Sequence, residues 1–162
     1  MNTLDYYNFD GKKVLLRVDF NIPITSELSF NESSELDETR IKMSLPTIQK
    51  ILSENGSIIL ISHWGRPKGE HVESRSLRYI LPIIEKLIGR KIIFCEDPLS
   101  DETASVAAAL KPGQVMLLEN IRFYKEELNA DEKFAQKIAA LGDCYVNDAF
   151  GTAHRNHAST VT

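Results

Sequence analysis

Five short apolar runs, nearly continuous rather than alternating, constrain the fold of this 162-residue chain more than any other feature. When almost every position in a strand is apolar, both faces of the strand are buried, as in a parallel sheet covered by helices. Arg17 is the polar exception and needs either a partner or an exit from the apolar interior. The runs span residues 14–18, 58–61, 92–95, 115–118 and 144–146.

Apolar residues at helical spacing fill the stretches between these runs. They predict helices over residues 41–52, 77–88, 100–110 and 131–141, with Ser76 as an N-cap and with Asn55-Gly56 and Gly89 at helix ends. Residues 26–38 form a polar stretch typical of a surface loop. The strand–helix alternation predicts an α/β fold. We expect a doubly wound, mainly parallel sheet with helices on both faces, as in a Rossmann-like lobe.

Length and composition indicate one ordinary globular domain, with 43% hydrophobic and 26% charged residues. The net charge of −4 gives no reason to expect a nucleic-acid or membrane partner. No run is a signal peptide or approaches the length of a membrane helix, so the expected location is the cytoplasm. Cys95 and Cys144 lie far apart in apolar runs, which predicts buried, reduced thiols rather than a disulfide.

Polar residues follow the predicted strands, at the edge where open α/β sheets bind ligands. Several arginines at one edge repel each other unless an anion lies between them, and guanidinium groups match phosphate and carboxylate oxygens. The pattern predicts a site for a small ligand that carries phosphate, carboxylate and a hydroxyl group. The candidate site residues are Asp19, Phe20, Asn21, Arg40, His63, Trp64, Gly65, Arg66, Arg122 and Arg155.

Several of these residues also have an ordinary structural explanation when taken alone. Arg40 fits a solvated helix start, Arg66 a turn, and His63 a hydrogen-bonded structural histidine. His154 and His157 have no evident third ligand, so no metal site is predicted. The sequence also lacks the GxGxxG, GxxxxGK[ST] and GxSxG motifs, which argues against dinucleotide binding, a P-loop and a hydrolase elbow.

Taken together, six segments make the chain resemble the N-terminal, substrate-binding domain of phosphoglycerate kinase. They are KKVLLRVDFNIPI, DETRIKMSLPTIQKIL, ISHWGRPKG, SLRYILPIIEKLIG, VMLLENIRFYKEE and YVNDAFGTAHRNHAS, and they cover almost the whole chain. The resemblance implies a glycolytic kinase that transfers a phosphoryl group reversibly between 1,3-bisphosphoglycerate and ADP, giving 3-phosphoglycerate and ATP. Trp64 departs from the family pattern, which has a smaller aliphatic residue there.

The resemblance also implies roles for the candidate residues. Asp19 and Asn21 would hold the glycerate part of the substrate. Arg40 would be the catalytic residue, stabilising the charge of the transferring phosphoryl group. The other basic residues would face the substrate, His63 and Arg66 as a basic patch and Arg122 and Arg155 on the non-transferred phosphate.

The same resemblance implies what this chain does not carry. Residues 1–162 would be an N-terminal domain incomplete at its C-terminal end, without the second lobe that binds ATP or ADP with Mg²⁺. We therefore expect no cofactor on this chain and no activity from it alone. The expected partners are the substrate and the second lobe, and the full enzyme is expected to be a monomer. The alternative is a stand-alone, non-catalytic module that binds an anion or a partner.

Overall fold

The described part of the computed structural model, residues 8–20, 38–65 and 67–148, contains a five-stranded sheet in which every pairing is parallel. The strands lie in the order β3-β4-β2-β1-β5. This confirms the predicted α/β class, and each apolar run forms a strand. The strands are β1 (Lys13–Val18), β2 (Ser57–Ile61), β3 (Ile92–Cys95), β4 (Val115–Leu118) and β5 (Cys144–Asp148).

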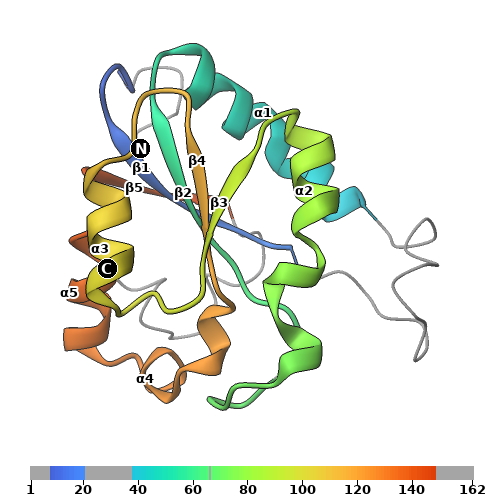
Figure 1. Ribbon diagram of the computed structural model, residues 1–162, viewed down its shortest axis with the longest axis vertical. Helices are drawn as coiled ribbons and strands as arrows, with labels where there is room; N and C mark the ends of the chain where they lie inside the picture. The colour runs from blue at the N-terminus through green and yellow to red at the C-terminus, as the bar shows by residue number, and fades with distance from the viewer. Residues whose placement is uncertain (1–7, 21–37, 66, 149–162) are drawn as a thin grey trace.

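Helices cover both faces of this sheet (Figure 1). Helices α1 (Thr39–Ser53) and α2 (Leu81–Ile88) pack on one face, and α3 (Asp101–Ala108) and α5 (Glu132–Ala139) pack on the other. The strand order explains the division, because the chain moves one way along the sheet through α1 and α2 and returns through α3 and α5. Right-handed crossovers then place the two sets of helices on opposite faces.

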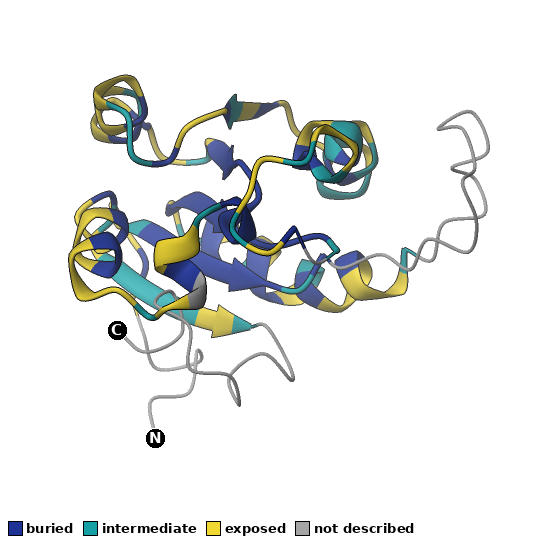
Figure 2. Ribbon diagram, turned by 90° about the horizontal axis from the view of Figure 1, so that it is seen from below, coloured by how far each residue is buried: buried dark blue, intermediate teal, exposed yellow. Residues whose placement is uncertain are grey.

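Neighbouring residues of β1 belong to different hydrophobic cores. Leu16, paired with Leu60, packs with α1 and α2, whereas Leu15, paired with Ile59, packs with α3 and α5. The central strands are accordingly buried along their length (Figure 2). This burial on two faces is the physical reason for the continuous apolar runs.

The predicted helix over residues 77–88 is wrong at its beginning. Residues Leu77–Tyr79 form a 3₁₀ turn, which Ser76 caps by accepting a hydrogen bond from the backbone N–H of Arg78, and the α-helix begins only at Leu81. Pro82 explains the break, because its ring nitrogen cannot donate to the preceding turn. The predicted end is correct, since Gly89 adopts a left-handed φ of 78°.

The other predicted helix ends agree with the structure. Asn55 adopts φ 67° after α1, Ser100 caps α3, and Asp131 caps α5. Three short elements were not predicted: the 3₁₀ turns Glu73–Arg75 and Ile121–Phe123, and the one-turn helix α4 (Lys125–Leu128). All three follow β2 or β4 in the chain, so the irregular structure lies between these strands and the helices that come next.

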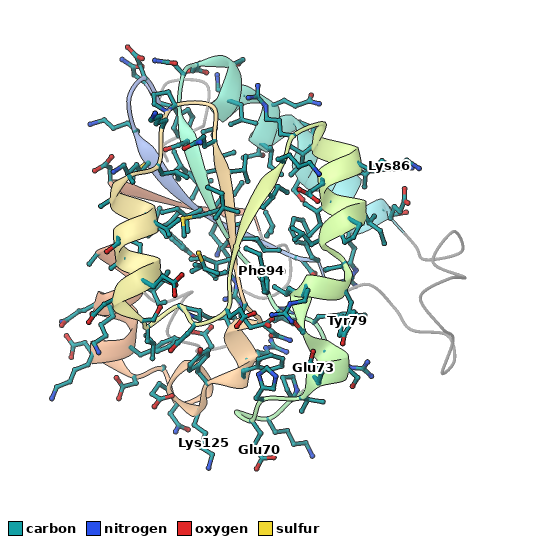
Figure 3. All side chains as sticks on the ribbon, viewed as in Figure 1. Glu70, Glu73, Tyr79, Lys86, Phe94 and Lys125 are labelled. Atoms are coloured by element: carbon teal, nitrogen blue, oxygen red, sulfur yellow. The ribbon has the colours of Figure 1, made fainter. Side chains whose placement is uncertain are left out.

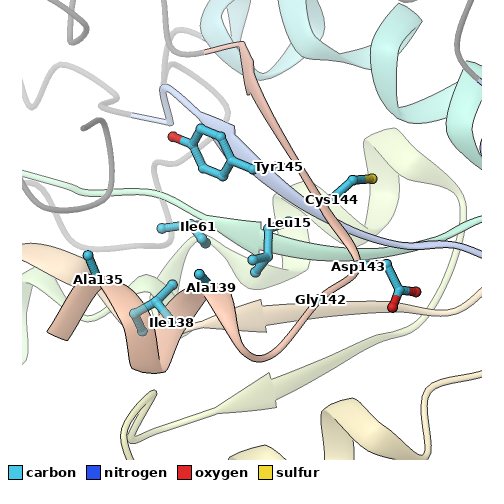
Figure 4. A pocket seen from close by; sticks show the side chains of 9 residues that line it. All are labelled: Leu15, Ile61, Ala135, Ile138, Ala139, Gly142, Asp143, Cys144 and Tyr145. Atoms are coloured by element: carbon cyan, nitrogen blue, oxygen red, sulfur yellow. The ribbon is translucent and has the colours of Figure 1, made fainter. Parts of the chain in front are cut away.

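Both cysteines are reduced thiols, as predicted, but burial of both was also expected and holds only for Cys95. Cys95 is buried and Cys144 is half-buried, and burial raises the pKa of the Cys95 thiol. An apolar pocket of about 180 Å³ lies between α5 and the sheet, where Leu15, Ile138 and Tyr145 line it (Figure 4). Asp143 supplies the only charged side chain in its lining. The pocket therefore does not suit the phosphorylated acid that the sequence predicts.

Candidate functional site

The connections diverge at the carboxyl ends of β2 and β4, which are neighbours in the sheet. The chain leaves β2 for α2 on one face and leaves β4 for α5 on the other. Loops that diverge from adjacent strands open a crevice, and open α/β proteins bind their ligands there. The predicted residues His63 and Arg122 lie in these diverging loops.

Asp19 and Arg40 meet at the same edge of the sheet, as the sequence predicted. Asp19 directly follows β1, and its carboxylate forms an ion pair with the guanidinium of Arg40 in the first turn of α1. The Arg40 side chain is 44% exposed and that of Asp19 is 15% exposed. A cation near a helix N-terminus opposes the helix dipole, and an exposed ion pair contributes only about 0–1 kcal/mol. Stability therefore explains the position of Arg40 poorly.

The loop after β2 is buried and closely packed. His63 and Trp64 are 4% and 2% exposed, and the guanidinium carbon of Arg75 lies 5.6 Å from the centre of the Trp64 ring. Gly65 has φ +68°, and a Cβ built on it would lie 2.5 Å from Nε of Arg75. The Trp64 ring and the Phe20 ring both belong to the hydrophobic core on the α1–α2 face. The packing of these two rings in the core fixes the backbone at the carboxyl edge of the sheet.

Arg122 lies in the 3₁₀ turn after β4 and is 4% exposed. Its N–H donates to Oδ1 of Asn120 over 3.1 Å, and its carbonyl accepts from the N–H of Gly69 over 3.0 Å. A guanidinium held at this depth needs negative charge or acceptors around it. These two bonds connect the backbone of Arg122 to the Asn120 side chain and to the segment that contains Gly69.

Hydrogen bonds connect the loops after β1, β2 and β4. The N–H of Phe20 donates to Oγ of Ser62 over 3.0 Å, and the N–H of Ile121 donates to the Ser62 carbonyl over 3.1 Å. The structure therefore brings together the segments that carry Asp19, His63 and Arg122. Asn21, Arg66 and Arg155, which were also predicted for the site, lie outside the described residues.

Two buried residues that sequence reasoning did not select, Glu119 and Asn120, organise this edge. Glu119 accepts from Oγ of Ser76 over 2.6 Å and from the N–H of Leu77 over 2.9 Å. The Asn120 amide donates to the carbonyl of Trp64 over 2.8 Å. Their signal in the sequence was two adjacent polar residues directly after a fully apolar strand.

Arg17, the polar exception inside the first apolar run, also finds its partner at this edge. Its Nη1 lies 3.2 Å from Oε1 of Glu127 in α4, and both side chains are fully buried. The pair connects β1 to the short helix that follows the Arg122 turn. The sequence predicted that Arg17 needs a partner or an exit, and it could not identify Glu127, which lies 110 positions away.

Two carboxyl groups near this edge have shifted pKa values in opposite directions. Burial raises the pKa of Asp148 at the end of β5, and the hydrogen bond from Thr47 only partly offsets it. Hydrogen bonds from His71 and Tyr79 lower the pKa of Glu73, an exposed residue in the turn Glu73–Arg75. Figure 3 shows Glu73 beside Tyr79. Glu73 thus bonds to side chains on both sides of it in the chain.

The described residues contain no group of three or more His, Cys, Asp or Glu side chains that could hold a metal ion. Among the same residues, no helix is long and apolar enough to cross a bilayer. We assign no step to a metal ion within this part of the chain. The positively charged and hydrogen-bonding groups instead suit a small anion.

A parallel, doubly wound sheet with arginine side chains at its carboxyl edge defines an open α/β protein, a class that binds its ligands at this edge. The family model described as "Phosphoglycerate kinase" matches residues 4–162. The chain therefore belongs to the phosphoglycerate kinase family.

Individual relatives agree with this assignment. The chain is 48% identical over 158 residues to a phosphoglycerate kinase of Chloroherpeton thalassium and 44% identical over 182 residues to one of Porphyromonas gingivalis. Both matches cover 98% of this chain, but only 38% and 42% of the respective relatives. The chain thus spans about two fifths of the length of these relatives.

Solved structures support the fold as well. The crystal structure of phosphoglycerate kinase from Pyrococcus horikoshii matches with a TM-score of 0.83 at 30% identity, over 98% of this chain and 39% of that one. The structure of the enzyme from Coxiella burnetii matches with a TM-score of 0.79 at 32% identity, over 97% of this chain and 37% of that one. In both comparisons the matched region is only part of the solved chain.

Proposed function

We propose that this chain provides the 3-phosphoglycerate-binding half of a phosphoglycerate kinase, which acts in glycolysis in the cytoplasm. The reaction moves the acyl phosphoryl group of 1,3-bisphosphoglycerate to ADP, giving 3-phosphoglycerate and ATP. The observation that carries the proposal is the Asp19–Arg40 ion pair at the carboxyl end of β1. It holds an arginine where a helix dipole disfavours a cation and where a bound anion would favour one.

In this proposal, Arg40 faces the transferring phosphoryl group and stabilises its charge as the bond to the acyl oxygen breaks. Phosphoryl transfer depends mainly on such positioning and electrostatic stabilisation. Asp19, together with Asn21, accepts hydrogen bonds from the glycerate hydroxyl. Arg122 and Arg155 bind the non-transferred phosphate, with His63 and Arg66 completing the basic surface.

We assign ATP or ADP and Mg²⁺ to a second lobe outside residues 1–162, with residues 1–162 as the N-terminal domain. The observation that supports this assignment is that the chain spans only about two fifths of the length of its relatives. The chain alone should then bind 3-phosphoglycerate but should not turn it over with ATP. ATP-dependent turnover by the 162-residue chain would contradict the need for a second lobe.

Isothermal titration of the chain with 3-phosphoglycerate tests the binding proposal. A charge-assisted hydrogen bond contributes about 1.5–3 kcal/mol, so Arg40→Ala should weaken binding by roughly 10- to 100-fold. Lys42→Ala is the matched control, because Lys42 is an exposed cation two positions along the same helix, paired with Glu38 over 3.7 Å. It should bind like the unsubstituted chain.

No heat at millimolar 3-phosphoglycerate would refute a preformed site on this chain. Equal affinities for the Arg40→Ala variant and the unsubstituted chain would show that Arg40 is not part of the binding site. Binding of inorganic phosphate as tight as that of 3-phosphoglycerate would favour a non-catalytic anion-binding module.

A further inference from the structure

Asn120 lies between the β2 and β4 loops, with no exposed surface. Its amide nitrogen donates to two carbonyl groups, that of Trp64 over 2.8 Å and that of Arg75 over 3.0 Å. Its amide oxygen accepts from the N–H of Arg122 over 3.1 Å. One side chain thus bonds to the backbone of three segments: the loop after β2, the turn Glu73–Arg75 and the turn Ile121–Phe123.

The neighbouring Glu119 fixes Asn120 in this position. Its buried carboxylate accepts from the N–H of Asn120 over 2.8 Å, as well as from Oγ of Ser76 and the N–H of Leu77. A buried carboxylate that accepts several hydrogen bonds is strongly held. Glu119 therefore holds the backbone of Asn120, while the side-chain amide is held by its own three hydrogen bonds.

The bonded backbone groups lie next to the basic side chains of the site. Trp64 directly follows His63, and the Arg122 N–H belongs to the residue proposed to bind phosphate. We propose that Asn120 is the positioning residue that sets the spacing between the His63 loop and the Arg122 turn, and thereby the affinity for the anionic substrate. This inference rests on the proposed function, and it adds a residue that acts through its neighbours.

Asn120→Asp tests the bridge with almost no change of shape. The new carboxylate keeps an oxygen for the Arg122 N–H but faces the carbonyl groups of Trp64 and Arg75 with a second oxygen. Two acceptors cannot bond to each other, so the link between the β2 and β4 loops is lost while the Arg122 link remains. We expect 3-phosphoglycerate affinity, measured by calorimetry, to fall at least tenfold.

The single tryptophan of the chain gives a second readout that needs no ligand. Trp64 is buried under Arg75, and its carbonyl is one of the two that Asn120 binds. We expect Asn120→Asp to shift the Trp64 emission to longer wavelength and to increase its quenching by acrylamide. A merely structural role elsewhere in the core would not produce this local change below the unfolding transition.

Asn55→Asp is the matched control. Nδ2 of Asn55 donates to Oδ1 of Asp10 over 2.9 Å at the opposite edge of the sheet, so the same change again places two acceptors together. This variant should lose some stability but should keep the Trp64 emission and the affinity of the unsubstituted chain. An Asn120→Asp variant that matches Asn55→Asp in both readouts would overturn the inference.

The remaining outcomes also decide the question. If the unsubstituted chain does not bind 3-phosphoglycerate, the proposed function fails, and the Trp64 readout alone decides whether Asn120 holds the loop. Altered emission with unchanged affinity would overturn the positioning role.

If Asn120→Asp does not fold, hydrogen exchange on the unsubstituted chain replaces that variant as the test. The Asn120 side-chain amide should then exchange more slowly than that of Asn55, and equal rates would overturn the inference.

Discussion

The two edges of the sheet bury polar groups very differently. At the amino edge the turns are exposed and use simple backbone contacts, such as the N–H of Gly11 on the Asn55 carbonyl over 3.2 Å. At the carboxyl edge Arg17, Glu119, Asn120 and Arg122 are all at least 96% buried. Burying polar groups costs free energy unless each is bonded. This chain therefore concentrates its buried polar groups, which cost free energy to bury, at the edge where a ligand would bind.

The largest expected effect comes from breaking the Arg17–Glu127 pair. Glu127→Ala should lower the free energy of unfolding by about 3–5 kcal/mol, because the buried guanidinium of Arg17 then loses the carboxylate with which it pairs. Urea denaturation measures this change. The double variant Arg17→Met/Glu127→Leu should recover most of the loss, since it removes both charges together. A loss below about 1 kcal/mol for Glu127→Ala would show that water reaches Arg17 and that the carboxyl edge is less buried.

Two glycines test the packing of the two edges. Gly69, at the carboxyl edge, has φ +80°, and a Cβ there would lie 3.0 Å from Cα of Lys125. Gly89, at the amino edge, has φ +78° with open space around it. Gly89→Ala should cost about 1 kcal/mol from backbone strain alone, whereas Gly69→Ala should cost about 2–4 kcal/mol because crowding is added. Equal melting temperatures for the two variants would contradict the tighter packing of the carboxyl edge.

Alkaline pH tests the burial around the Arg17–Glu127 pair. Burial raises the pKa of Tyr145 to about 12, with Arg17 opposing and Glu127 adding to the shift. The unfolded chain releases this proton near pH 10 and the folded chain only near pH 12, so stability should fall between these values.

In the Tyr145→Phe variant, the free energy of unfolding should fall less between pH 9 and pH 11.5, by about 2 kcal/mol. Urea denaturation at the two pH values measures this difference. Lysines and other tyrosines titrate in both proteins, so the difference between them isolates Tyr145. Identical pH dependence would indicate that the phenol is hydrated.

The smallest expected effects come from exposed arginines at either edge. Arg90 donates to the Gly113 carbonyl over 2.9 Å at the amino edge, and Arg40 pairs with the Asp19 carboxylate at the carboxyl edge. Alanine at either position should change the free energy of unfolding by less than about 1 kcal/mol. The edges should differ in ligand affinity instead, which only Arg40→Ala should reduce. A larger stability loss for Arg40→Ala would mean that the ion pair serves the fold.

The sequence predicted the fold well because strand burial leaves a direct pattern. An apolar run such as residues 58–61 has to be covered on both faces, and helices at 3.6-residue spacing provide that cover. It predicted the start of α2 poorly, since the apolar stripe from Leu77 onward outweighed the effect of Pro82 on the backbone. It did not predict the turn Glu73–Arg75 and α4, where bonds come from distant residues, from Asn120 to the Arg75 carbonyl and from Arg17 to Glu127.

For the site, the sequence by itself determined which residue types gather at the carboxyl edge, because parallel strands all end there. It identified Asp19, Arg40, His63 and Arg122 as candidates and showed that Arg17 needed a partner or an exit. Only the tertiary structure decided who the partners are. Glu127 meets Arg17 across 110 positions, and Asn120 bridges the loops of Trp64 and Arg122. Side-chain spacing along the chain cannot encode such pairings, since they depend on which strands become neighbours when the sheet forms.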